Sequence, residues 1–180
     1  MRLYHGSDVM VDKPVIVLNT GFSDLGRGFY VTDDMEVARR RAQTRARRCG
    51  SEHGMVSIFE LDEGCVPWAM WGACQPSLSG SVGGGPFGLR FEESKEGVVA
   101  WARYIAACRM GNTEVVGLGQ PSIVRAWIAT EEIEMVCAGF APAEDIADFV
   151  DPASLTVQYC FANQDVIEWH LAFVEAIPVS

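Results

Sequence analysis

Two short segments decide how this chain of 180 residues is interpreted: Leu3-Tyr4-His5-Gly6-Ser7 and Gly26-Arg27-Gly28-Phe29-Tyr30-Val31-Thr32. Each has the pattern of a strand end that carries one polar ring at a sharp backbone feature. In the first, His5 is followed by a residue without a side chain, which places an imidazole beside a bare amide. In the second, a Gly-x-Gly run precedes Tyr30, which places a flat ring at the mouth of a tight turn.

The rest of the chain predicts strands and helices in one domain that spans residues 1–180. Short apolar runs predict strands at residues 2–5, 28–32, 55–61, 122–129, 155–161 and 172–179. Helices are expected at residues 33–48 and 93–110, from Pro142 and from Asp165. The helix from Pro142 is expected to turn Ile146 and Phe149 inward. Because the elements do not follow a βαβ alternation, the predicted fold class is α+β.

Local signals predict the ends of the first helix and one long loop. Asp33 is the expected N-cap, with Glu36 completing a capping box, and Gly50 is expected to end the helix. The Gly-, Ser- and Pro-rich stretch 72–88 predicts a long loop. This loop either covers a site or is a passive linker.

The charge of the chain is unevenly distributed. Residues 36–48 hold six arginines and one glutamate, a local charge of +5, so the remainder carries −15 within a total of −10. Long-range attraction to nucleic acid is therefore not expected of the whole chain. A basic face on an acidic body suits a phosphate-bearing ligand better than a long nucleic-acid track, although RNA binding through this helix stays open as an alternative.

Composition limits the other classes of function. The six cysteines and three histidines lack the spacing of a metal site, so no metal is expected. The chain has no apolar run of membrane-spanning length and no signal-peptide pattern at its start. The expected compartment is the cytoplasm, with no membrane partner.

The two opening segments resemble the first two signature segments of the ADP-ribosyltransferase superfamily, in the branch of poly(ADP-ribose) polymerases and diphtheria toxin. In that branch, a His-Gly pair and a Gly-x-Gly-x-Tyr run form the nicotinamide pocket for NAD. The resemblance implies split mixed and antiparallel β-sheets with flanking helices around an NAD cleft. It also implies NAD as the substrate and no metal.

The resemblance assigns roles to residues of both segments. Gly6 matches the glycine whose backbone pairs with the carboxamide, and its missing side chain is expected to let the ligand approach. His5 matches the histidine that contacts the adenosine ribose, and Tyr30 matches the tyrosine that stacks on nicotinamide. Ser7 and Arg27 are further matches to cofactor-binding positions.

A third segment, Thr156-Val157-Gln158-Tyr159-Cys160-Phe161, resembles the closing segment of an uncharacterised bacterial family within the superfamily. That family also has a Trp-containing helix and a late strand, which match residues 101–109 and 123–132. Gln158 stands at the third catalytic position, where its carbonyl is expected to accept from the ribose 2′-hydroxyl. A neutral hydrogen bond is weaker than one to a carboxylate, so stabilisation of the developing cation is expected to be weaker than with glutamate. The resemblance implies that glutamine at this position is compatible with mono-transfer but not with efficient chain elongation.

Arg41 lies eleven residues after Tyr30, where the superfamily often has an aromatic residue. Its guanidinium could stack on the ligand or pair with the pyrophosphate. The alternative is a solvated arginine without a ligand.

Two classes of function follow from the resemblance. The first is an NAD-dependent mono-ADP-ribosyltransferase with His5, Tyr30 and Gln158 as catalytic residues and a protein or nucleic acid as the acceptor. Resemblance to toxin and phage-defence relatives implies a toxin-like role, with a neutralising antitoxin or immunity protein as a partner. The second is a module of the same fold that binds NAD or a nucleotide without turnover.

Overall fold

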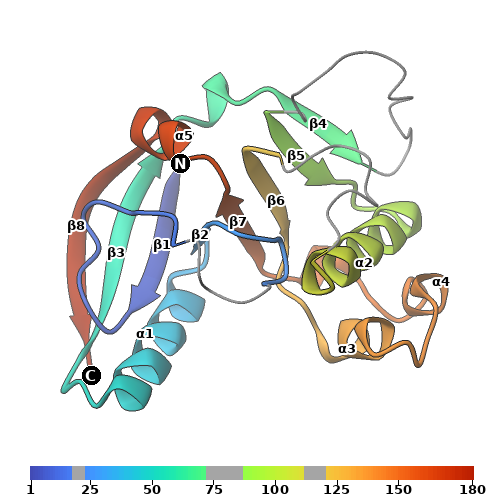
Figure 1. Cartoon of the computed structure of the whole chain (residues 1–180), viewed down its shortest axis with the longest axis horizontal. Helices are drawn as coiled ribbons and strands as arrows, with labels where there is room; N and C mark the ends of the chain where they lie inside the picture. The colour runs from blue at the N-terminus through green and yellow to red at the C-terminus, as the bar shows by residue number, and fades with distance from the viewer. Residues whose placement is uncertain (18–22, 72–86, 112–120) are drawn as a thin grey trace.

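The computed structural model describes residues 1–17, 23–71, 87–111 and 121–180 (Figure 1). An 8-stranded sheet runs through these residues in the order β4-β5-β6-β7-β2-β1-β3-β8. Its strands are β1 (Arg2–Ser7), β2 (Phe29–Thr32), β3 (Gly54–Leu61), β4 (Trp68–Trp71), β5 (Gly88–Phe91), β6 (Ile123–Trp127), β7 (Val157–Phe161) and β8 (Leu171–Val179). The helices are α1 (Met35–Cys49), α2 (Lys95–Arg109), α3 (Glu131–Cys137), α4 (Ala143–Ile146) and α5 (Gln164–His170). The structure therefore confirms a mixture of strands and helices.

The sheet has a narrow junction at its centre. Strands β1 and β2 share a single register pair, Tyr4 with Thr32, whereas β1 and β3 pair along the whole length of β1. Figure 1 shows β8, β3 and β1 on one side of this junction and β7, β6, β5 and β4 on the other. Because the ladder between β1 and β2 is so short, the strand edges separate beside it and leave room for a site.

Helix α1 packs against the N-terminal half of the sheet through small residues. Ala38, Ala42 and Ala46 recur every fourth position and are buried, as expected for one face of a helix. The N-cap is Asp34 and not the predicted Asp33: the Asp34 carboxylate accepts from the backbone of residues 36 and 37. Asp33 is displaced because the Thr32 hydroxyl already accepts from the Asp34 backbone N–H and holds the chain extended.

At the end of α1 and around α4, two predictions are confirmed and one is wrong. Gly50 ends α1 with a φ of 70°, a left-handed conformation that favours glycine. Ile146 is buried as predicted, but Phe149 is 81% exposed. Helix α4 ends at Ile146, so Phe149 lies beyond the helix and no longer follows its inward face.

The C-terminal half of the sheet contains one βαβ unit, which corrects the expectation that none is present. Strands β5 and β6 are parallel neighbours, and α2 lies between them in the chain. Gly88 belongs to β5, so the predicted loop at 72–88 ends earlier than expected, and its residues 72–86 lie outside the described residues. The unpredicted β4 is also parallel to β5.

Two features are absent from the described ranges of the chain, a membrane-spanning helix and a cluster of metal ligands. None of the helices there is long and apolar enough to cross a membrane. No group of three or more His, Cys, Asp or Glu side chains in the same ranges could hold a metal ion.

Candidate functional site

A small cavity of about 30 Å³ lies where β1 and β2 separate. We call it the inner cavity. Five residues that the sequence singled out line it together, although they are far apart in the chain: His5, Gly6, Tyr30, Arg41 and Gln158. The other lining residues are Tyr4, Val31, Thr32, Ala38 and Ile128. These residues therefore meet at one place in the fold.

A larger cavity of about 510 Å³ lies between β1 and α1. We call it the arginine groove. It is lined by His5, Gly6, Ser7, Val37, Arg40, Arg41, Thr44, Arg45 and Arg48. It shares His5, Gly6 and Arg41 with the inner cavity. Of the predicted site residues, Arg27 lines neither cavity and lies exposed between the two glycines of its turn.

The imidazole of His5 is held in one orientation by the neighbouring strand. Its Nδ1 lies 2.7 Å from the carbonyl oxygen of Tyr30, so Nδ1 must carry the proton and donate. The remaining nitrogen, Nε2, is then free of a proton and can accept a hydrogen bond from a ligand hydroxyl. Burial lowers the pKa of His5, and the positive charges of Arg41 and Arg45 lower it further. His5 is therefore a neutral hydrogen-bonding group near pH 7.

This lowered pKa predicts a loss of stability in mild acid. The folded state resists protonation of His5 while the unfolded state does not, so the free energy of unfolding should fall as the pH drops below about 6.5. In His5→Gln, which keeps a donor for the Tyr30 carbonyl, the fall should be smaller. Urea unfolding between pH 5 and 7.5 measures this. The exposed His53 supplies the control, His53→Gln, and a wild-type slope in His5→Gln would contradict the assignment.

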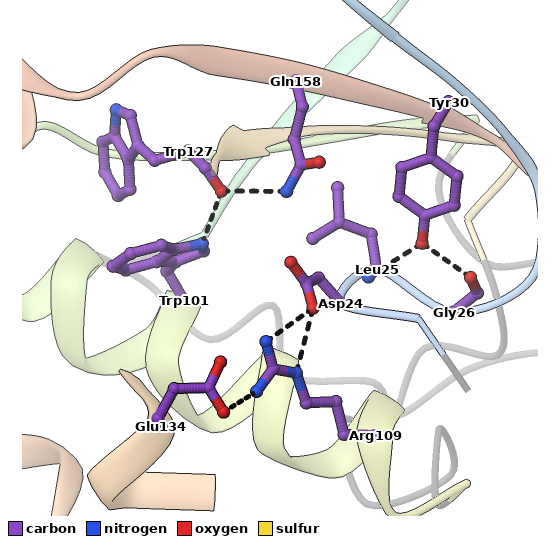
Figure 2. A network of polar contacts seen from close by, with 9 residues as sticks. All are labelled: Asp24, Leu25, Gly26, Tyr30, Trp101, Arg109, Trp127, Glu134 and Gln158. Atoms are coloured by element: carbon purple, nitrogen blue, oxygen red, sulfur yellow. Dashed lines mark hydrogen bonds and ion pairs between the residues drawn. The ribbon is translucent and has the colours of Figure 1, made fainter. Parts of the chain in front are cut away.

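The side-chain amide of Gln158 is buried, with 2% of the residue exposed. Its Nε2 donates to the carbonyl of Trp127 at 3.2 Å, and the indole N–H of Trp101 donates to the same carbonyl (Figure 2). Because that partner is an acceptor, the amide nitrogen must face it and the amide oxygen must face away. This oxygen, Oε1, is buried and has no hydrogen-bond partner among the described residues.

The hydroxyl of Tyr30 is engaged by its own turn. It donates to the carbonyl of Gly26 at 2.6 Å and accepts from the backbone N–H of Leu25 at 3.0 Å (Figure 2). Gly26 has a φ of 85°, so glycine is required there. Burial raises the pKa of Tyr30 above its usual range, and the phenol is therefore a fixed neutral group. The half-buried ring, and not the hydroxyl, is the part left for a ligand.

We call residues 24–28 the Gly26 turn, and an ion-pair network anchors it. The carboxylate of Asp24 lies 2.8 Å from the guanidinium of Arg109, which also pairs with Glu134 at 2.7 Å. Leu25 is fully buried, and Figure 2 shows its side chain between the Gln158 amide and the Tyr30 ring. The Gly26 turn therefore occupies space beside the two predicted ligand groups.

The role expected for the missing side chain of Gly6 is corrected by its surroundings. A Cβ atom at this position would lie 2.0 Å from the carbonyl oxygen of Ala38 and 2.8 Å from the backbone nitrogen of Ala42. The space beside Gly6 is filled by the backbone of α1, so glycine is needed for packing of the helix on the strand. Only the backbone of Gly6 remains available to the two cavities.

Several site residues were not found from the sequence. The carbonyl of Trp127 has no side-chain signature, and Leu25 is an ordinary apolar residue within a turn. Arg40, Arg45 and Arg48 were noted only as part of a basic face. The alanines at every fourth position of α1 mark its buried side, and this pattern could have indicated which arginines flank the groove.

The comparisons with known proteins cover only the first part of the chain. The model of a family described as protein of unknown function (DUF3990) matches residues 1–68, which is less than half of the chain. This range contains β1, β2, α1 and β3, and so it includes the arginine groove but not Gln158. No curated protein and no solved structure matches the chain.

Proposed function

We propose that this protein is an NAD-dependent mono-ADP-ribosyltransferase, which transfers ADP-ribose from NAD to a macromolecular acceptor. The observation that carries the proposal is the unpartnered, buried Oε1 of Gln158 at the inner cavity. A buried acceptor without a partner costs about 1–3 kcal/mol, and a ligand hydroxyl would recover this. His5 and Tyr30, which the resemblance assigns to the same ligand, line the same cavity.

In the proposed reaction, the bond between nicotinamide and ribose breaks and positive charge develops on the ribose. The Tyr30 ring stacks on nicotinamide, and Gln158 Oε1 accepts a hydrogen bond from the ribose 2′-hydroxyl. His5 Nε2 accepts from a hydroxyl of the adenosine ribose. Nicotinamide leaves with the bonding electron pair, a nucleophile of the acceptor donates its pair to the same ribose carbon, and the proton of that nucleophile is released to solvent.

The two cavities differ in how they would receive NAD. The arginine groove, at about 510 Å³, has a size usual for small-molecule sites and would hold the adenosine half, with the pyrophosphate near Arg41. The inner cavity, at about 30 Å³, has only the volume of one water molecule. Nicotinamide therefore needs more room than the inner cavity offers, and we propose that it gains this room by displacing Leu25, which packs beside Tyr30.

The experiment is incubation of the purified chain with NAD labelled on its adenine. Free nicotinamide is measured, and labelled ADP-ribose is sought on the protein and RNA of a cell lysate. A transferase releases nicotinamide and labels an acceptor in equal amounts. If NAD binds but no nicotinamide appears with any acceptor, the transferase proposal fails.

The second candidate is a module that binds NAD or a nucleotide without turnover. The observation in its favour is that no carboxylate is present among the residues that line the inner cavity. A neutral amide stabilises a developing cation less than a charged group does. The toxin-like role and the neutralising partner belong to the first candidate, as implications of the resemblance.

Because Leu25 occupies space that nicotinamide would need, we expect that weaker anchoring of the Gly26 turn makes the binding of NAD more favourable. Asp24→Asn removes the charge that pairs with Arg109 but leaves the pair of Arg109 with Glu134. Because partly exposed ion pairs contribute up to about 1 kcal/mol, KM for NAD should fall about threefold. The measurement is the KM for nicotinamide release, or the Kd for NAD if turnover is absent.

The control for this variant is Arg103→Gln, which breaks the exposed ion pair of Arg103 with Glu144 on the neighbouring helices. It should leave the KM unchanged. A raised or unchanged KM in Asp24→Asn would show that the Gly26 turn does not compete with the substrate.

A further inference from the structure

The cations of the arginine groove are arranged in two pairs along α1. Arg40 and Arg41 form the pair nearer the inner cavity, and Arg41 lines both cavities. Arg45 and Arg48 form the second pair. The centres of the two pairs are six residues apart, or about 9 Å along the helix axis at 1.5 Å per residue. The groove therefore offers two separate cationic centres.

Most of the arginines that line the groove have no acidic partner among the described residues. Arg45 has an acidic partner, Asp8, at 3.7 Å. Within the described ranges, Arg40, Arg41 and Arg48 make no hydrogen bond or ion pair. A chain with 24 acidic residues thus leaves three guanidinium groups on one groove unpaired. Such an arrangement suits a ligand that brings two anionic groups.

We propose that the arginine groove selects a nicotinamide dinucleotide with an additional phosphate on its adenosine ribose, NADP⁺, in preference to NAD⁺. The pyrophosphate lies against Arg41, beside the inner cavity. The additional phosphate lies on the other side of the adenosine ribose, against the pair that contains Arg48. This inference rests on the proposed function, because it takes the adenosine half of the dinucleotide to occupy this groove.

The surroundings favour a dinucleotide over single-stranded nucleic acid. Sites for single strands combine basic residues with aromatic side chains on which the bases stack. The only ring among the residues that line the arginine groove is the imidazole of His5, which is already held by Tyr30. The groove volume of about 510 Å³ also suits one small molecule.

The test is calorimetric titration of the full chain with NAD⁺ and with NADP⁺, which does not depend on turnover. Since hydrogen bonds to charged groups are strong, NADP⁺ should bind about tenfold more tightly than NAD⁺. In Arg48→Gln this preference should disappear, so that the two dinucleotides bind with about equal affinity. Arg47→Gln is the control, because it removes the same charge from the neighbouring position, which does not line the groove.

The outcomes separate this inference from the proposed function. Equal affinity of the wild type for the two dinucleotides overturns the selection of NADP⁺ but leaves the transferase proposal intact. Failure of both to bind overturns both proposals. An RNA octamer that binds through Arg48, without any preference for NADP⁺, would show a nucleic-acid track and also overturn the inference.

Discussion

Gly6→Ala is expected to destabilise the protein more than any other single-methyl change at this site. The new methyl group would lie 2.0 Å from the Ala38 carbonyl oxygen. The Cβ position is fixed by the backbone of residue 6 and its partner is a backbone atom, so the contact cannot be relieved by a side-chain rotation. Overpacking usually costs 1–3 kcal/mol and occasionally more, and here we expect about 3 kcal/mol or more. For a chain of this size, that corresponds to a fall in Tm of about 10 °C.

Thermal unfolding followed by circular dichroism measures this effect. Gly64→Ala is the matched control, because its new methyl group would meet nothing closer than an Asp62 carboxylate oxygen at 3.7 Å. Its Tm should stay within about 2 °C of the wild type, since open surface positions tolerate such changes. If Gly6→Ala melts like the wild type but fails to bind NAD, glycine serves ligand approach alone and the packing explanation is wrong.

Gln158→Met is expected to remove most nicotinamide release without loss of stability. Methionine keeps the approximate length of glutamine but cannot accept from the ribose hydroxyl. It removes the unpaired Oε1, which costs about 1–3 kcal/mol, and it gives up one neutral hydrogen bond worth about 0.5–1.5 kcal/mol. The Trp127 carbonyl keeps its donor from Trp101. The variant should therefore be as stable as the wild type or more stable.

The expected loss in nicotinamide release is tenfold or more, because a misplaced ribose adds to the lost hydrogen bond. Activity and urea unfolding are measured on the same preparations. If Gln158→Met is stable but releases less nicotinamide, Gln158 is present to bind the ligand. A strongly destabilised variant, or one with unchanged release, would assign Gln158 to the core alone.

The sequence predicted the parts of the site that carry a local pattern. His5 precedes a glycine, Tyr30 follows a Gly-x-Gly run, and Gln158 was assigned through the resemblance of the segment that contains it. Short apolar runs predicted strands β1, β2, β3, β6, β7 and β8 but not β4 and β5, and Gly50 predicted the end of α1. Each of these signals lies within a few residues of the feature that it predicts.

The features that depend on tertiary packing were either not predicted from the sequence or predicted wrongly. The surroundings of Gly6 are set by the approach of α1, which a sequence pattern does not locate. Leu25 reaches the site because its turn is anchored on Arg109, which is distant in the chain. Strand β5 was not predicted: its first residue, Gly88, was included in the Gly- and Ser-rich loop, and no element was assigned to Leu89 and Phe91, which are buried.

The location of the site is tested most directly by a crystal structure of the chain with NAD. We predict that the nicotinamide lies against the Tyr30 ring, with the ribose 2′-hydroxyl within hydrogen-bond distance of Gln158 Oε1. Leu25 should have moved from its position between these two groups, and the pyrophosphate should lie beside Arg41. A dinucleotide bound elsewhere, or one bound in the groove with Leu25 unmoved and Gln158 Oε1 still unpartnered, would contradict the proposed transferase site.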